Sequence, residues 1–265
     1  MRKPGSMRRC AHAGAALLLM ATAARAGVVV HMSARDLPNG QAKDSQVFYA
    51  QSGMLRIDHL DQQGHVEGIQ LIRDGVIWDI DVTKRSFRKL DKQAVAAQMG
   101  AMQNKMQGFL QNLPPEQRAA LQARMSAMQQ RQYSVTDAGR SERVGSYSCE
   151  IWQVTRAGKV VTENCVASKG SLKGGDELVG AAHSAAATAT DVISAAPQLA
   201  RGAASTLALY SKMDGFPVLI RDMSGATASR EEIVTSIETQ SLPADKFAIP
   251  RGFNEVNLGA GGDSE

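Results

Sequence analysis

The chain has 265 residues, of which 43% are hydrophobic and only 5% aromatic, and its formal net charge is +4. Residues 1–26 hold five basic and no acidic groups, so the remaining 239 residues carry a net charge of −1. This balance excludes the basic surface that is typical of nucleic-acid-binding proteins. The length is sufficient for one domain with a substantial, mainly aliphatic core.

The N-terminus has the pattern of a secretory signal peptide. A basic segment is followed by an apolar run over residues 13–24 and by the small-x-small site Ala24-Arg25-Ala26. We therefore expect cleavage after Ala26 and export to the periplasm, or alternatively secretion. The apolar run is shorter than the roughly 20 residues that span a bilayer, and no other segment comes closer. We expect a protein that is not integral to the membrane.

Residues 27–90 have the pattern of an antiparallel meander. Short β-branched segments alternate with turn residues, and Asp74-Gly75 is a strong hairpin turn. The strands are expected near residues 28–33, 46–49, 54–58, 68–72, 76–80 and 86–90.

Residues 93–131 change to a helical period. Apolar residues recur at steps of three and four, and Pro114-Pro115 interrupts them, which predicts a hairpin of two amphipathic helices. The members of this stripe are Val95, Met99, Met102, Met106, Phe109 and Leu113, followed by Leu121, Met125 and Met128. Its methionines fit core packing, an adaptable lid over a hydrophobic cavity, or thioether binding of Cu(I). Regular helical spacing already accounts for their positions, so we expect neither a metal nor a cofactor.

Strand character returns from Tyr133 to Ala167 and includes both cysteines that follow the signal segment. A three-residue loop centred on Ala157, with Gly158 left-handed, would place Cys149 opposite Cys165. Opposed residues of an antiparallel pair lie within disulfide range, so a Cys149–Cys165 disulfide is expected. The spacing suits neither a zinc site nor a C-x-x-C redox pair, and no histidine lies near enough in sequence to activate a thiol.

The last third combines helix and strand. An alanine-rich stripe starts a second helical segment over residues 175–212, interrupted by Pro197. Strands are expected at 216–220, 233–237 and 246–249, and the Gly-rich tail 259–265 is expected to be disordered.

These elements predict an α+β fold in a single domain over residues 27–258. One antiparallel sheet of roughly ten short strands curls rather than staying flat, and the inserted helices can cover only one side of it. The expected architecture is an incomplete β-barrel with helices over its concave face.

Five segments extend this expectation by resemblance: GMLRIDHLD, IQLIRDGVIWDIDVTKRSFRKL, GSYSCEIWQV, GFPVLIRD and KFAIPRGF. In this order they resemble a family of exported bacterial proteins of unknown function that is similar in fold to the lipoprotein carriers LolA and LolB. The resemblance implies a half-barrel closed by helices around a hydrophobic cavity. It carries over no individual functional residue.

Other motifs point away from catalysis. Asp58, His59, Asp61 and His65 could gather around a metal, but their place at a strand edge is more typical of solvated surface. The chain lacks the G-x-S-x-G, H-E-x-x-H and Gly-rich phosphate-loop motifs, so no catalytic residue is assigned.

We therefore expect a non-enzymatic periplasmic binding protein for a lipid, an acyl chain or another hydrophobic ligand, with the helical hairpin as its lid. The alternative is an envelope protein-interaction or chaperone-like module, because residues 113–119 resemble the LTxxQ-type segment of Spy/CpxP-like proteins. The sequence leaves the oligomeric state open. The residues expected to line the ligand are Trp78, Val95, Met99, Met102, Met106, Phe109, Met125, Met128 and Trp152.

Overall fold

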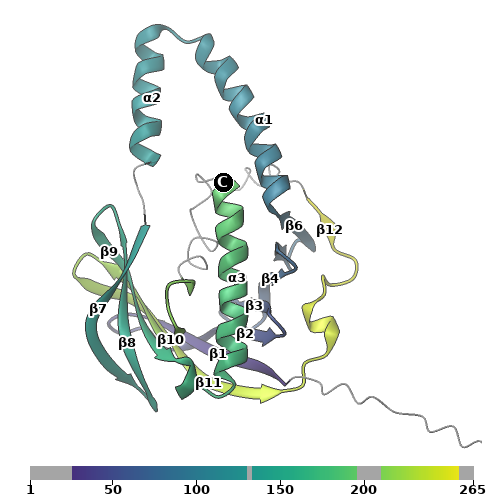
Figure 1. Cartoon of the computed structure of the whole chain (residues 1–265), viewed down its shortest axis with the longest axis vertical. Helices are drawn as coiled ribbons and strands as arrows, with labels where there is room; N and C mark the ends of the chain where they lie inside the picture. The colour runs from purple at the N-terminus through teal and green to yellow at the C-terminus, as the bar shows by residue number, and fades with distance from the viewer. Residues whose placement is uncertain (1–25, 130–132, 196–209, 257–265) are drawn as a thin grey trace, which may run out of the picture.

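One large, curved and unclosed sheet dominates the computed structural model (Figure 1). The structure describes residues 26–129, 133–195 and 210–256, with the backbone alone for residues 102, 122 and 124–129. The signal segment, most of the expected second part of helix 175–212, and the tail therefore lie outside the described residues.

The sheet has twelve strands. They are β1 Gly27–Asp36, β2 Lys43–Gln51, β3 Met54–Leu60, β4 Val66–Arg73, β5 Val76–Asp81, β6 Ser86–Leu90, β7 Tyr133–Val144, β8 Tyr147–Arg156, β9 Lys159–Ser168, β10 Gly215–Ser224, β11 Thr227–Gln240 and β12 Asn254–Glu255. The helices are α1 Lys92–Gln111, α2 Pro115–Gln129 and α3 Gly175–Ala195, with short 3₁₀ turns η1 Lys169–Ser171 and η3 Ala244–Phe247.

The spatial order of the strands leaves two edges far apart in the fold. The order is β12-β6-β5-β4-β3-β2-β1-β11-β10-β9-β8-β7, antiparallel throughout except for the parallel β12–β6 pair. The predicted fold class, a curved antiparallel half-barrel with helices, is thus confirmed.

Helix α3 fills the concave face. Its stripe of alanines is fully buried, and it packs against β1 to β5, β10 and η1 (Figure 1). Small side chains let a helix approach a sheet closely, so an alanine-rich face suits a position inside a curved sheet. The buried members of this face include Ala181, Ala182, Ala185, Ala186 and Ala189.

A second apolar cluster lies on the other face of β1 to β5. Val29, Leu71 and Ile80 pack there with Leu242 and Phe247. The expectation of a strand at residues 246–249 is wrong, because residues 244–247 form η3 instead. This short turn places the Phe247 ring, 1% exposed, over the cluster.

The cysteine hairpin shows a corrected register. Strands β8 and β9 meet at a two-residue turn, Ala157-Gly158, in which both residues have positive φ (52° and 76°). A bulge after Val154 adds a further shift, so Cys149 pairs with Ala167 and Ile151 pairs with Cys165. The shorter turn and the bulge each shift the expected register by one residue. The total shift is two residues, so both cysteines stay on the same face of the sheet. The predicted Cys149–Cys165 disulfide is confirmed as a diagonal bridge with a Cα–Cα distance of 5.2 Å.

Candidate binding site at the mouth of the half-barrel

The α1–α2 hairpin joins the two sides of the open sheet. Helix α1 follows β6 near one edge, and α2 precedes β7, the other edge (Figure 1). Asp91 caps α1 by accepting a 2.7 Å hydrogen bond from the Ala94 amide, and Lys89 pairs with its other oxygen at 2.9 Å. The base of the hairpin is therefore fixed to the sheet by local bonds.

The apolar stripe of α1 is fully buried at its base and only partly buried farther out. Val95 is 0% exposed in the main core, Met99 packs partly against that core, and Met106 is half-buried. Phe109, one helical turn further, is 56% exposed. The stripe thus continues beyond the part of the body against which it packs, and its outer half leaves apolar surface uncovered.

The tip of the hairpin is built by Arg118. Its guanidinium donates to the carbonyl oxygens of Leu110 and Gln111 at the C-terminus of α1, at 3.0 and 3.3 Å, and to that of Leu113 in the connection, at 3.1 Å. A cation at a helix C-terminus is also favoured by the helix dipole. Helices α1 and α2 diverge from this tip toward their bases (Figure 1).

The structure brings together only part of the predicted ligand-lining set. Val95, Met99 and Trp152 belong to or pack against the core that contains α3. Trp78 instead packs with the cluster on the other face, where its ring lies 5.2 Å from the Arg73 guanidinium carbon. Met102, Met125 and Met128 lie outside the residues whose side chains the structure describes.

The difference in burial between Val95 and Phe109 predicts that truncating these two side chains of α1 has different effects on stability. Val95→Ala should lower the free energy of unfolding by about 2 kcal/mol, because it leaves a void in a closed core. Phe109→Ala should change it by less than about 0.5 kcal/mol, because the ring contributes little burial. Urea unfolding of both variants measures the difference, and equal losses would show that the outer half of α1 packs as tightly as its base.

Comparison with known proteins places this architecture in a family. Residues 90–253 match the model of a family described as a domain of unknown function, DUF4412. The chain belongs to this family. The match extends from the end of β6 to the start of β12, so it includes the hairpin, α3 and the β7–β11 half of the sheet.

Solved structures offer more distant similarities. An uncharacterized conserved protein from Thermus thermophilus is 8% identical, with a TM-score of 0.39, 87% of this chain covered and 89% of the other. PNGF-II is 7% identical, with a TM-score of 0.44 and 88% of this chain covered, but this chain spans only 31% of PNGF-II. No curated protein matches the sequence.

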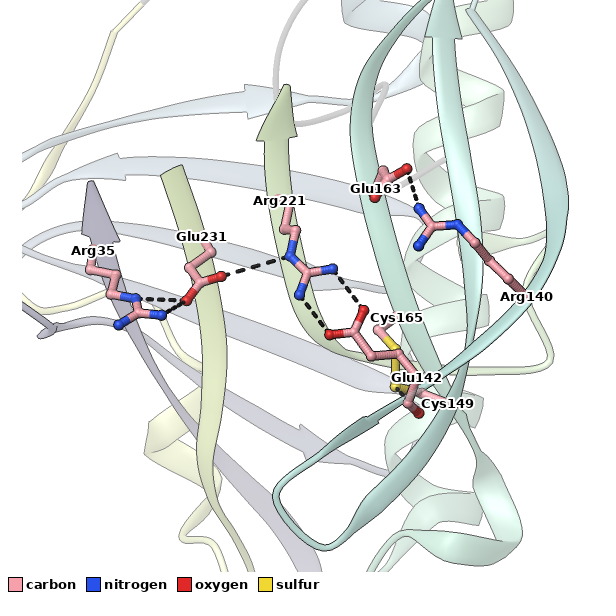
Figure 2. A network of polar contacts seen from close by, with 8 residues as sticks. All are labelled: Arg35, Arg140, Glu142, Cys149, Glu163, Cys165, Arg221 and Glu231. Atoms are coloured by element: carbon pink, nitrogen blue, oxygen red, sulfur yellow. Dashed lines mark hydrogen bonds and ion pairs between the residues drawn. A yellow bond between two sulfur atoms is a disulfide. The ribbon is translucent and has the colours of Figure 1, made fainter. Parts of the chain in front are cut away.

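A row of alternating charges runs from β1 into the DUF4412 half of the sheet (Figure 2). Arg35, Glu231, Arg221 and Glu163 are neighbours in register on β1, β11, β10 and β9. Glu231 accepts from Arg35 at 2.6 Å and lies 3.7 Å from the Arg221 guanidinium. Each carboxylate of the row is held by a guanidinium, so the row has the character of a structural element.

Strand β7 bends, and the bend brings two of its side chains into contact with this row of charges. Its pairing with β8 shifts between Asp137 and Ser141, and Gly139 takes a positive φ of 66° at the bend. The bend lets Glu142 accept two hydrogen bonds from Arg221, at 2.6 and 2.7 Å, and lets Arg140 reach Glu163. The network therefore fixes the position of an edge strand against the middle of the sheet.

The network lowers the pKa of two carboxyl groups. The hydrogen bonds from Arg221 hold the pKa of Glu142 below its ordinary value. Burial alone would raise the pKa of Glu163, but the hydrogen bonds from Arg140 and Gln153 outweigh it, and the pKa is lowered. A depressed pKa stabilises the fold above the unfolded pKa, about 4.3 for Glu, and this stabilisation is lost as the pH falls through the folded pKa.

Glu142→Gln should therefore lower the free energy of unfolding by roughly 1–2 kcal/mol at pH 7. The difference from the unmodified protein should stay constant down to about pH 5 and shrink below about pH 4, where Glu142 is protonated in the unfolded state first and, at still lower pH, in the folded state as well. Thermal unfolding from pH 7 to pH 3 measures it, with Glu150→Gln at an exposed position of β8 as a charge-matched control. A difference that grows on acidification would contradict the assignment.

The aspartates and histidines that could have gathered around a metal make ordinary local contacts instead. Asp58, 2% exposed, pairs with Arg56 at 2.5 Å, and Asp61 accepts from the amides of Gln63 and His65 within its turn. Within the described residues no group of three or more His, Cys, Asp or Glu is arranged to hold a metal ion. Among the described helices, none has both the length and the apolarity needed to cross a bilayer.

Proposed function

We propose that this DUF4412 protein is a non-enzymatic periplasmic carrier that binds a lipid, an acyl chain or another hydrophobic ligand under its α1–α2 hairpin. The observation that carries the proposal is the decline in burial along α1, from 0% exposure at Val95 to 56% at Phe109. Apolar side chains that continue beyond their own core provide surface for a ligand, and methionine adapts to varied shapes. Met99 and Met106 are the contacts we assign to that ligand.

The fold supports this proposal in general terms. A curved, unclosed sheet with helices over its concave face is the architecture that the resemblance to LolA-like carriers implies, and the hairpin bridges the two sides of that sheet. The LolA-like assignment is itself part of the proposal. The ligand would lie between the hairpin and the end of the body, since the concave face is already occupied by α3.

The disulfide supports the proposed location. Disulfides persist in oxidising compartments such as the bacterial periplasm and are rare in the cytosol. The Cys149–Cys165 bridge and the signal-like N-terminus therefore favour the same compartment.

Displacement of a fluorescent fatty acid tests the carrier function. The purified protein should bind the probe, and oleate should displace it. Met99→Gln and Met106→Gln should each weaken binding by about tenfold, because a polar group then lies in the apolar contact. The control is Met54→Gln on β3, which packs with the apolar cluster on the other face of the sheet. Absence of probe binding, or equal binding by all variants, would refute the proposal.

A second candidate function is favoured by the exposed ring of Phe109. A protein-interaction or chaperone-like module would use this outward apolar residue and its neighbours to hold an unfolded client. Such a module should suppress the aggregation of a reduced, unfolded protein, and Phe109→Ser should abolish the effect. A carrier should bind the fatty acid probe without protecting the client.

A further inference from the structure

The hairpin differs in charge from the rest of the molecule. Residues 92–129 contain four basic residues and one acidic residue, a net charge of +3, whereas the rest of residues 27–265 carries −4. The basic residues are Lys92, Lys105, Arg118 and Arg124. The single acidic residue, Glu116, stands in the first turn of α2, where the helix dipole favours it. A projecting cationic element on an otherwise acidic body indicates a partner with negative charge.

Among the described side chains of the hairpin, exposed apolar surface lies at its outer end. Among the described side chains, the large hydrophobic residues that are exposed are Phe109, at 56%, and Val256, at 36%. Half-buried Leu110 and Leu113 adjoin Phe109, and Lys105 lies exposed one turn before it. This tip is the part of the hairpin that projects farthest from the sheet (Figure 1).

We propose that the tip of the α1–α2 hairpin docks on an anionic lipid surface. Lysine and arginine beside phenylalanine and leucine are the composition of helices that bind at a membrane interface. The cations are attracted to the lipid phosphates, while the Phe109 ring enters the boundary between headgroups and acyl chains. Arg118 stabilises the geometry that presents the ring, because it ties the end of α1 to the start of α2.

The small size of the tip favours a lipid surface over a folded protein. A stable protein interface buries about 800 Å² on each partner, which is more than one phenylalanine and two leucines at a helical turn provide. A lipid surface accepts a small apolar contact as long as cations accompany it. This docking is independent of the proposed carrier function, because surface binding requires no ligand under the hairpin.

Vesicle sedimentation tests the docking. Purified protein should sediment with vesicles of phosphatidylcholine mixed with phosphatidylglycerol, and weakly with phosphatidylcholine alone. Phe109→Ser should weaken binding to the mixed vesicles by about tenfold through the loss of apolar burial. Lys105→Glu should weaken it by a factor on the order of ten through charge, and about 1 M salt should have a similar effect by screening.

Two controls on the body accompany these variants, and all proteins share the same termini. Val256→Ser removes the other large hydrophobic residue that is exposed among the described side chains, and Lys159→Glu makes the same charge change at the exposed β8–β9 turn. Both should sediment like the unmodified protein. Absence of sedimentation with the mixed vesicles would overturn the proposal, as would equal sedimentation by Phe109→Ser. Phe109-dependent capture of an unfolded polypeptide without vesicle binding would overturn it in favour of a protein partner.

Discussion

Gly175→Ala should destabilise the protein by about 3 kcal/mol, a large effect for the addition of one methyl group. Gly175 begins α3 after a three-residue connection from η1, and a Cβ at this position would lie 1.9 Å from the carbonyl oxygen of Lys169. That atom belongs to the backbone of η1, so no side-chain rotation can relieve the contact. Either η1 or the first turn of α3 must move, and α3 is the helix that fills the half-barrel.

Gly180 provides the matched control on the same helix. A Cβ at Gly180 meets no atom within 4 Å, and the residue is exposed. Gly180→Ala should therefore stabilise the protein by about 0.5–1 kcal/mol through helix propensity. Urea unfolding of the two variants should give changes of opposite sign. Two stabilising changes would mean that η1 does not pack against the start of α3 as described.

Loss of the disulfide is the second large effect. The bridge joins residues 16 apart in sequence, and closing a loop of this size in the unfolded chain is worth about 3 kcal/mol. Both sulfurs are buried in the main core, so Cys149→Ala with Cys165→Ala also leaves a small packing defect. We expect a loss of about 3–4 kcal/mol, which corresponds to a melting temperature lower by about 6–16 °C.

Reduction of the disulfide tests the effect of the covalent bridge separately from the packing defect that the alanine substitutions leave. Dithiothreitol should lower the melting temperature of the unmodified protein by most of this amount and leave the double alanine variant unchanged. An unmodified protein that melts at the same temperature with and without reductant would contradict the stabilising role of the bridge.

Features set by neighbouring residues could be predicted from the sequence. Alternation and turn residues predict the meander, and the proline pair predicts the division between α1 and α2. The disulfide could be predicted although its register could not. A bulge after Val154 depends on how β8 and β9 twist together, and no residue in the hairpin marks it.

Features that depend on distant partners were not predictable in this way. Glu142 and Arg221 are 79 residues apart, and each is an ordinary charged residue in a strand. Their pairing requires both the strand order and the bend of β7 at Gly139. Only the long-range register shows that they meet.

Periodicity predicts that a helix has an apolar face but not what covers that face. The alanine stripe of α3 occupies the concave surface, whereas the apolar stripe of α1 is fully buried only at Val95 and leaves Phe109 exposed. The α1–α2 hairpin, which we expected to be a lid, therefore stands as an arch over one end of the half-barrel (Figure 1). This difference moves the proposed ligand contacts from the concave face, which α3 occupies, to the side chains of α1.

Native mass spectrometry of the purified protein tests the central claim, that a hydrophobic ligand is held under the hairpin. The carrier proposal predicts a fraction of molecules heavier than the bare chain by the mass of a lipid or fatty acid. Extraction with organic solvent should remove the excess mass, and Met99→Gln with Met106→Gln should reduce it. A bare mass in every preparation, including one incubated with added oleate, would contradict the claim.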